Sequence, residues 1–523
     1  MAKNHGVFIY EEATALTVPK EASQALVVVG CAPVNLVDEP KVNVPVLANT
    51  ATEAMQELGY SKEFKKYGLC AAMNVTANMY PVAPVVYINV LDPAKHKRAL
   101  SETVVPVSDM QATLSQTGVL KTNLTVKVPS TTDQYTKVSD PDTGDNPATE
   151  HWYEKGTGVY TPSEDTYPDG EKTYCSLTPE THIADGTEDP AALNWYTLSD
   201  GVYTASTASS CSASDTFYSL TETIVTPDTG DDPQTNGWYV KSGDDYILST
   251  DTRVMGGTDY YVKSTIDTPV TLVEDTDYTL SFDDDGYLVI TLIVSSDYAG
   301  ATVLSVSGYQ LDPAAITKDD IIGSVDVSTG KESGMEVIRQ IYPKLGIIPG
   351  ILIAPYWSQV PEVGIALSAK AANINGVFKA MAYLDIDTTL ATKYTDVKTV
   401  KESSGFTSEF CVPCWPEVVV GSTQYPYSIV AAARTLYEDA DNEGIPSRSP
   451  SNISLSITGL ALSDGTEVML DQDQATTVDQ YGCMTAVNLN GFKMWGDYTG
   501  AYPSSSDAKD IWISVRRMFS WQG

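Results

Sequence analysis

Histidine is scarce in this chain: the 523 residues include only four, His5, His96, His151 and His182. Histidine is the side chain whose pKa best suits general acid and base catalysis near neutral pH. None of the four lies in an HExxH pattern, and the sequence contains no GxSxG nucleophile motif. A pair of carboxylates could still carry out acid and base chemistry. The scarcity of histidine nevertheless favours a protein that is not an enzyme.

Basic residues are few as well. Lys and Arg total 32 against 68 Asp and Glu, which gives a formal net charge of −36. Nucleic acids and anionic membranes bind clusters of basic side chains, so neither is expected as a partner. The acid is concentrated between 131 and 265, where 24 acidic residues face 6 basic ones. We expect this segment to be exposed to solvent.

Long apolar runs are missing. No stretch approaches the roughly 18 to 20 residues that cross a bilayer, and the first residues, MAKNHGVFIYEE, lack the apolar region of a signal peptide. We therefore expect no direct membrane insertion and assembly in the cytoplasm of the producing cell. The seven cysteines are an odd number without framework spacing, which indicates reduced thiols.

Motifs for cofactors are also absent. The turn Gly30–Pro33 offers one glycine where a dinucleotide fingerprint needs three, and Gly330-Lys331 lacks the upstream glycine of a phosphate loop. Cys411 and Cys414 have CxxC spacing, but a redox site needs a helix start there, and a zinc site needs a second ligand pair. Ordinary strand thiols fit better, and we predict no cofactor and no metal.

Alternating strand and helix patterns at both ends of the sequence predict one discontinuous α/β body. Its first part is 23–110 and its second part is 313–523, whereas 1–22 resembles an extended arm. The first part should contain a strand at 25–30, helices at 50–58 and 62–78, and a strand at 85–90. The second part should contain helices at 334–345, 361–381, 389–401 and 428–441, with strands at 350–354, near 382–387 and at 409–420.

The middle of the sequence, 111–267, is rich in Thr, Ser, Asp, Tyr and Gly and has an internal repeat of 43 residues. The repeated positions are Trp152-Tyr153, Trp195-Tyr196 and Trp238-Tyr239, then Tyr160, Tyr203 and Tyr246, then Tyr174, Phe217 and Tyr260. Short aromatic strands between Asp-Gly turns predict small β modules that lean on one another. The segment 268–312 should return to the body as further strands, with FDDDGY at 282–287 as a hairpin turn.

Two features of the repeats have alternative interpretations. Trp152, Trp195 and Trp238 could be stacking platforms for sugars, although a module this small needs an aromatic core of its own. The Asp-rich turns could bind calcium, but Gly144 occupies a position where an EF-hand needs an oxygen ligand, so solvated turns fit better. These acidic residues are Asp140, Asp142, Asp145, Asp228, Asp231 and Asp232.

The C-terminal stretch GFKMWGDYTGAYPSSSDAKDIWISVRRMF, 491–519, reads as a strand, a turn, a Ser-rich loop and a helix. Asp507 should cap that helix. Ile511, Val515 and Met518 fall at i, i+4 and i+7, which predicts a core face with Arg516 and Arg517 beside it. The two arginines are candidates for ion pairs within or between subunits.

This stretch resembles the contractile tail sheath proteins of bacteriophages and phage-like particles. Five further runs resemble the same family: GVFIYEEAT and VVVGCAP near the N-terminus, GIIPGILIAP at 346–355, CVPCWPEVVVGS at 411–422 and SPSN at 449–452. The resemblance covers 6–35 and about 310–519. It does not extend over most of 111–310.

The resemblance implies a structural subunit that forms hexameric rings stacked helically around an inner tube, with baseplate and tail terminator proteins as further partners. Contraction would drive the tube through a cell envelope, and the protein would reside in the virion tail. It also implies an N-terminal strand donated to a neighbouring subunit, for which the candidates are Gly6, Val7, Phe8, Ile9, Tyr10, Glu11 and Glu12. Proteins of this family usually continue past the RRMF segment, so the tube-contact residues are expected outside this sequence.

Two alternatives come from other functional classes. The tandem aromatic repeats could recognise a surface glycan or a host receptor, with the α/β parts as a scaffold. A thiol-dependent enzyme using Cys411 and Cys414 is the other.

Overall fold

The computed structural model describes residues 19–522, and the predicted arm Gly6–Glu12 lies outside the described residues. The chain forms two compact units. The first contains the described residues up to Val128 together with those from Val270 onward, and the second is Pro129–Pro269. Two separate stretches of sequence therefore build the first unit, and the second unit is inserted between them.

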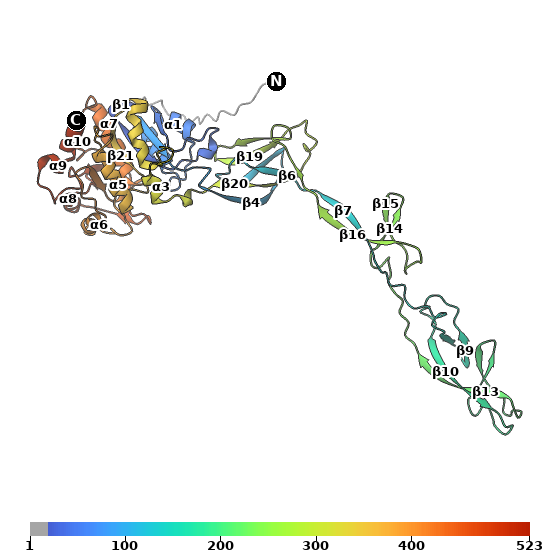
Figure 1. The fold of residues 1–523 in the computed structure, drawn as a ribbon. Helices are drawn as coiled ribbons and strands as arrows, with labels where there is room; N and C mark the ends of the chain where they lie inside the picture. The colour runs from blue at the N-terminus through green and yellow to red at the C-terminus, as the bar shows by residue number, and fades with distance from the viewer. Residues whose placement is uncertain (1–18, 523) are drawn as a thin grey trace. The chain divides into compact units, whose positions relative to one another are not determined.

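A six-stranded sheet forms the centre of the first unit, in the order β2-β3-β1-β21-β22-β23 (Figure 1). Five of its strands are parallel, and β2 runs antiparallel to β3 at one edge. The bounds are β1 (Lys20–Gly30), β2 (Pro45–Ala48), β3 (Val82–Asn89), β21 (Pro349–Ile353), β22 (Met381–Asp385) and β23 (Cys411–Cys414). Because β1 pairs with β21, the two halves of the body share one continuous sheet.

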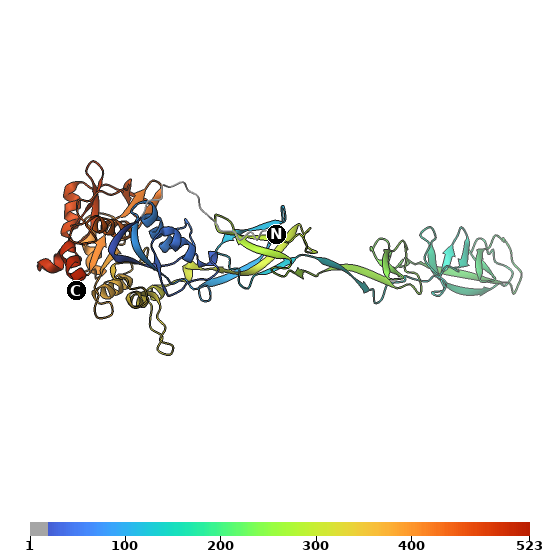
Figure 2. The ribbon, with the colours of Figure 1, turned by 90° about the horizontal axis from the view of Figure 1, so that it is seen from above.

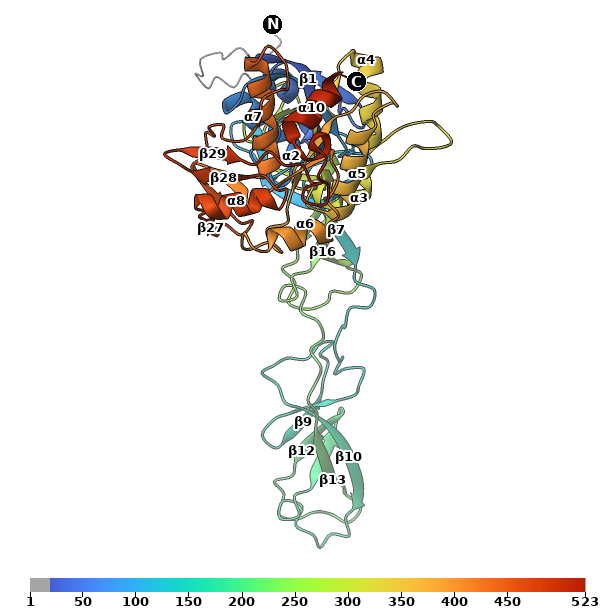
Figure 3. The ribbon, with the colours of Figure 1, turned by 90° about the vertical axis from the view of Figure 1, so that its left-hand side faces the viewer.

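Helices cover both faces of this sheet (Figure 3). The crossover from β1 to β3 and the crossover from β21 to β22 run in opposite directions along the sheet, so right-handed connections place their helices on opposite faces. α1 (Ala51–Leu58) and α2 (Gly68–Asn78) belong to the first crossover, and α7 (Tyr427–Asp441) packs beside α2. α5 (Pro361–Ala372) belongs to the second, with α3 (Lys318–Ile322) against it.

Several helices are shorter than the sequence patterns predict. α2 begins at Gly68, because residues 64–66 form a turn, and α5 ends at Ala372, where Asn375 and Gly376 adopt positive φ angles of 58° and 74°. The predicted helix at 334–345 is a 3₁₀ helix (Gly334–Gln340) followed by α4 (Ile341–Leu345), and α6 covers only Val397–Ser403. Two other short 3₁₀ helices are Val34–Leu36 and Pro313–Ala315.

The C-terminal part of the first unit adds two small sheets beside the main one. One is ordered β25-β24-β26-β27, and the other is the hairpin β28-β29, which continues the edge of β23 through a parallel bridge from Cys414 to Met484. The strands are β24 (Glu417–Val420), β25 (Thr423–Tyr425), β26 (Gly459–Ala461), β27 (Glu467–Val468), β28 (Thr485–Asn488) and β29 (Phe492–Trp495). The last helices are α8 (Gln472–Gln480), α9 (Ala508–Ile511) and α10 (Ile513–Gln522).

A second hydrophobic core in the first unit lies between two antiparallel sheets, β17-β6-β20-β4 and β18-β19-β5. Leu114, Leu288 and Ile290 from one sheet pack with Leu304 and Val306 from the other. The strands are β4 (Lys97–Pro106), β5 (Gln111–Thr117), β6 (Thr125–Val128), β17 (Val270–Thr271), β18 (Tyr278–Phe282), β19 (Tyr287–Leu292) and β20 (Val303–Leu311). β5 and β6, which the composition places in the insertion, therefore pair within the first unit, and the second unit starts only at Pro129.

The second unit consists of short strands and contains a closed six-stranded barrel, β10-β13-β11-β12-β9-β8 (Figure 2). Its interior is filled by Tyr160, Cys175 and Tyr203, with Leu177 and Leu220 packed against them. The strands are β8 (Tyr153–Lys155), β9 (Val159–Pro162), β10 (Tyr174–Ile183), β11 (Tyr196–Ser199), β12 (Val202–Ala205) and β13 (Thr216–Ile224).

The remaining strands of the second unit form a four-stranded sheet in the order β15-β14-β16-β7. They are β7 (Thr131–Lys137), β14 (Tyr239–Ser242), β15 (Asp245–Leu248) and β16 (Tyr260–Asp267). Each of the three repeated tryptophans packs against the aromatic ring 22 positions later, with centroid separations of 6.1, 5.5 and 5.8 Å. These rings are therefore engaged in packing within the unit.

Candidate functional site

The C-terminal segment ends in two helices rather than one. The side chain of Asp507 accepts a hydrogen bond from the backbone N–H of Lys509 at 3.1 Å and so caps α9. Trp512 then adopts an extended conformation, with φ −96° and ψ 125°, before α10 begins. This break means that Ile511 does not share a helix with Val515 and Met518.

α10 buries its charged face, which corrects the predicted orientation. Arg516 and Arg517 are 7% and 3% exposed, whereas Val515 and Met518 are only partly buried and Phe519 is 52% exposed. The i, i+4, i+7 spacing gives the wrong face here because it assumes an unbroken helix whose charged side chains are exposed to solvent. Both arginines instead meet partners inside the protein.

Arg517 forms a bidentate ion pair with Asp439 on α7. Its Nη1 donates to Oδ1 at 3.0 Å and its Nη2 donates to Oδ2, and both side chains are almost fully buried. Burial alone would lower the pKa of Arg517, but the charge and hydrogen bonds of Asp439 outweigh it and raise the pKa. The pair ties the last helix to the centre of the α/β body.

Arg516 has weaker partners. Its guanidinium lies 4.6 Å from the centre of the Phe410 ring, and its Nη1 is 3.6 Å from a carboxylate oxygen of Asp510. Its Nε has no hydrogen-bond partner among the described residues. The contact with Phe410 is a cation–π interaction that lets the charge lie against an apolar surface.

Two buried carboxyl groups, those of Asp479 and Asp497, lie close together near the start of α10. The backbone N–H of Asp497 donates to Oδ1 of Asp479 at 3.2 Å, and the N–H of Ser514 donates to Oδ1 of Asp497 at 3.3 Å. Burial raises the pKa of both groups, that of Asp479 to about 6. The carboxyl of Asp497 lies at the N-terminus of α10, where the helix dipole favours a negative charge, but burial outweighs this and leaves its pKa raised.

A buried lysine holds the loops that precede α10. Nζ of Lys401 donates to the carbonyl oxygens of Tyr481 and Tyr502, at 2.8 and 2.7 Å. Burial lowers the pKa of this lysine. Sequence reasoning missed Lys401, Asp439 and Asp479, because nothing local to their sequence marks partners that lie far along the chain.

Cys411 and Cys414 are buried on β23, inside the α/β body. Burial raises the pKa of Cys411 to about 11 and raises that of Cys414 well above its usual value. Both side chains are therefore neutral thiols at neutral pH, which are poor nucleophiles and poor metal ligands.

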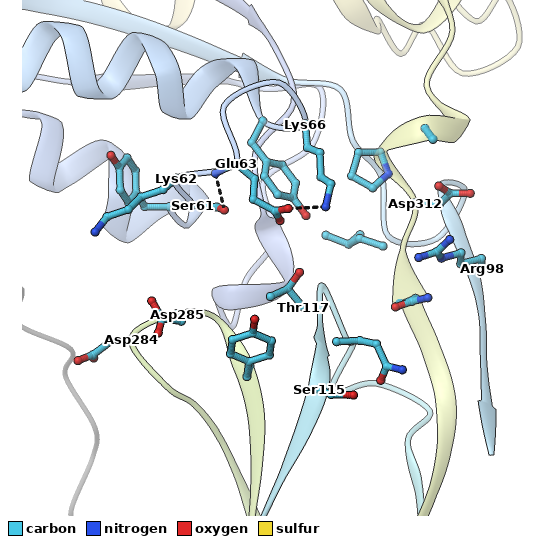
Figure 4. A pocket seen from close by; sticks show the side chains of 18 residues that line it. Ser61, Lys62, Glu63, Lys66, Arg98, Ser115, Thr117, Asp284, Asp285 and Asp312 are labelled. Carbon is cyan, nitrogen blue, oxygen red and sulfur yellow. Dashed lines mark hydrogen bonds and ion pairs between the residues drawn. The ribbon is translucent and has the colours of Figure 1, made fainter. Parts of the chain in front are cut away.

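A cavity of about 660 Å³ in the first unit opens between the loop 60–67 and the ends of β5, β19 and β20. Figure 4 shows charges of both signs around it, with Lys66 paired to Glu63 and with Arg98 beside Asp312. No His or Cys lines it. Its lining therefore offers neither an imidazole base nor a thiol nucleophile.

The two Asp-rich turns, for which calcium binding is the less favoured interpretation, contact each other. The backbone N–H of Asp231 donates to the carbonyl oxygen of Asp142, and that of Asp145 donates to the carbonyl oxygen of Asp228. The carboxylates of Asp231 and Asp145 accept hydrogen bonds from the backbone N–H groups of Asp142 and Asp228 on the opposite turn. Among residues 19–522, no cluster of three or more His, Cys, Asp or Glu side chains is arranged to hold a metal ion.

Within the same described range, no helix combines the length and the apolar character that a membrane span requires.

Comparison with known proteins gives one curated relative, and no family model matches the chain. The relative is the tail sheath protein of Burkholderia phage BcepMu, 28% identical over 259 residues. The match covers 47% of this chain and 52% of that protein, so the chain matches about half the length of its curated relative.

Two solved structures are also similar. One is the sheath tail protein from Desulfitobacterium hafniense, with a TM-score of 0.36 and 9% identity over 98% of this chain and 80% of that chain. The other is the baseplate of the anti-feeding prophage, with a TM-score of 0.27 and 19% identity over 38% of this chain and 48% of that chain. The sequence match by itself confirms the predicted resemblance: this chain is similar to a phage tail sheath protein.

Proposed function

We propose that this protein is a structural subunit of a contractile tail sheath. The observation that carries the proposal is the sequence similarity to the tail sheath protein of a Burkholderia phage. Copies would form hexameric rings that stack helically around an inner tube and contract to drive the tube through a cell envelope. The inner tube, the baseplate and the tail terminator would be its partners, in the tail of a phage or phage-like particle.

The architecture of the first unit supports a mechanical role. Its central sheet is assembled from both ends of the chain, with β1 beside β21, and Arg517 ties the last helix to α7. Force applied to the last helix would therefore reach α7, which packs on the sheet, through a buried ion pair as well as through the chain. In this proposal the α/β body contacts neighbouring copies and the tube, while the acidic insertion faces outward.

The strand proposed to link neighbouring copies is Gly6–Glu12. Val7 and Ile9 alternate weakly with Phe8 and Tyr10 and give it one apolar side, and its main chain can pair with a sheet edge. Physically, contraction needs interfaces with two stable arrangements and a covalent link that survives the change. A donated strand provides such a link.

Negative-stain electron microscopy tests the proposal. An affinity tag inserted in the exposed turn at 326–330, where Val327 is 98% exposed, allows particles to be purified through this chain. Striated rings or hollow cylinders are the expected result. If the tag-purified sample and the separately purified protein both contained only dispersed single chains, this result would contradict the proposal.

A further inference from the structure

The second unit contains its own internal comparison. The first strands of the three repeats, β8, β11 and β14, start 43 residues apart. The last strands of the first and third repeats, β10 and β16, start 86 residues apart, which is twice that spacing. The first two repeats close into the barrel, whereas the third joins β7 in the four-stranded sheet. Positions that differ between the third repeat and the first two therefore show what this sheet does that the barrel does not.

The inner face of the four-stranded sheet is aromatic. Tyr135 stacks on Tyr246 with ring centroids 4.0 Å apart, and it also contacts Tyr239 at 5.3 Å. Tyr246 in turn contacts Tyr261 at 4.9 Å. Successive side chains of a strand point to opposite faces, so the residues between these tyrosines lie on the outer face.

Four aliphatic residues occupy that outer face: Val240, Ile247, Val262 and Ile266, here called the aliphatic face. Ile247, Val262 and Ile266 are 54%, 46% and 45% exposed, and Val240 lies directly opposite Ile247 across the strand pair. At every equivalent position the first two repeats carry a polar residue. In the first and second repeats these are Glu154 and Thr197 for Val240, Thr161 and Thr204 for Ile247, Ser176 and Ser219 for Val262, and Glu180 and Thr223 for Ile266.

Charge follows the same division. The strands and loops of the four-stranded sheet, 131–137 and 238–267, contain 6 acidic and 4 basic residues. The intervening 138–237 contains 19 acidic and only 2 basic residues. Two copies of the barrel would repel each other strongly, whereas two copies of the sheet would not.

We propose that the aliphatic face packs against the same face of a second copy of this chain. β-Branched side chains on a sheet pack well against a like sheet at a separation of roughly 10 Å. Along these strands the alternation places one charged residue on this face, Asp245 at the end of β15. The four aliphatic side chains themselves carry no charge and fit an equally apolar, nearly neutral partner, which a second copy supplies at equal concentration. The contact is self-complementary, so it has a local twofold axis and pairs copies two by two.

This pairing differs from the head-to-tail contact that a ring requires, and it does not depend on the proposed function. Four side chains bury far less than the roughly 1,200 Å² of a stable interface. The contact is therefore weak between free chains, and it becomes populated where a high local concentration lets two insertions face each other in opposite orientations.

Chemical cross-linking tests the proposal in the full chain. Ser264 lies on the outer face between Val262 and Ile266, and Thr221 is the equivalent exposed residue of the second repeat. Ser264→Cys and Thr221→Cys would each be made with Cys211→Ser, because Cys211 is the one cysteine that is not buried. A bis-maleimide with a reach near the roughly 10 Å sheet separation is the probe.

Ser264→Cys should give at least about tenfold more cross-linked dimer than Thr221→Cys, since a twofold contact brings identical residues together. The yield should fall to the control level when the aliphatic face is given the residues of the second repeat. That fourfold variant is Val240→Thr, Ile247→Thr, Val262→Ser and Ile266→Thr. Val262→Ser alone serves if the fourfold variant does not fold. Equal yields at both positions, or a yield unchanged by the polar residues, would overturn the proposal.

The result is separable from that of the proposed function. Cylinders seen by microscopy without preferential cross-linking at position 264 would remove only this inference. Cross-linking at position 264 in chains that form no rings would support the paired contact and leave the sheath proposal without support.

Discussion

Gly144 and Gly230 pack backbone against backbone where the two PDTGD turns of the second unit meet. A methyl group added to Gly230 would lie 2.4 Å from the backbone nitrogen of Gly144. Both residues have positive φ angles, 68° and 67°, which side chains rarely adopt. Only glycine satisfies the conformation and the contact together.

Gly230→Ala should therefore open the paired turns, at a cost above the roughly 1 to 2 kcal/mol of a left-handed conformation alone. Hydrogen exchange measures this, because the N–H groups of Asp145 and Asp231 cross between the turns. Gly243→Ala is the matched control, with a φ of 65° and no atom within 4 Å of the added carbon. Equal exchange in the two variants would show that the close contact is unimportant.

The ion pair between Asp439 and Arg517 should matter most when only one partner is removed. Arg517→Met leaves a buried carboxylate without a partner and should destabilise the protein by about 3 to 5 kcal/mol. Arg517→Met combined with Asp439→Leu should recover much of this loss, because no unpaired charge remains. Urea unfolding followed by tryptophan fluorescence is the measurement.

Arg448→Met provides the control for that series, since its pair with Glu438 has an arginine side chain that is 49% exposed. An exposed pair contributes about 0 to 1 kcal/mol. A loss from Arg517→Met no larger than that from Arg448→Met would mean that the buried pair does not hold α10 in place.

Some strands and helices of the body follow closely from local sequence. The apolar run at Ala25–Gly30 forms a buried parallel strand, and α1 and α7 lie within a residue of their predicted bounds. Such elements are predictable because burial on both sides of a parallel sheet demands an unbroken apolar run. The early end of α5 was also visible in Asn375-Gly376, a turn signal that outweighs the helical pattern before it.

The orientation of α10 was not predictable, and the reason is physical. Arg517 is buried because Asp439, 78 positions earlier, lies opposite it. Hydrophobic periodicity scores a residue by its own polarity and contains no information about a partner that distant. Likewise, 43-residue spacing marks repeats, but it does not tell which two of three close into a barrel.

Thiol labelling should distinguish Cys211 from the other six cysteines. All seven are free thiols, and only Cys211 is partly exposed. One equivalent of a small maleimide should react with the native protein and seven should react after denaturation, with Cys211→Ser removing the native reaction. Native labelling of Cys411 or Cys414 would revive a role for the CxxC pair, because it would require a thiolate that burial opposes.

The pH dependence of stability should carry a contribution from Asp479. Burial raises its pKa from 3.8 to about 6 in the folded protein. Below pH 4 the carboxyl is protonated in both states and contributes nothing. Between pH 4 and 6 the folded state keeps a proton that the unfolded state has released, so stability falls as the pH rises.

Above pH 6 the full cost of a buried charge is present, up to about 3 kcal/mol for this difference in pKa. Asp479→Asn removes the titrating group while keeping an oxygen that can accept from Asp497. The free energy of unfolding of Asp479→Asn minus that of the native sequence should therefore increase between pH 4 and pH 7. Asp473→Asn, at an exposed position of the same helix, should show no such increase. A flat difference for Asp479→Asn would mean that its carboxylate is stabilised as the anion, by groups that outweigh its burial and the nearby charge of Asp497.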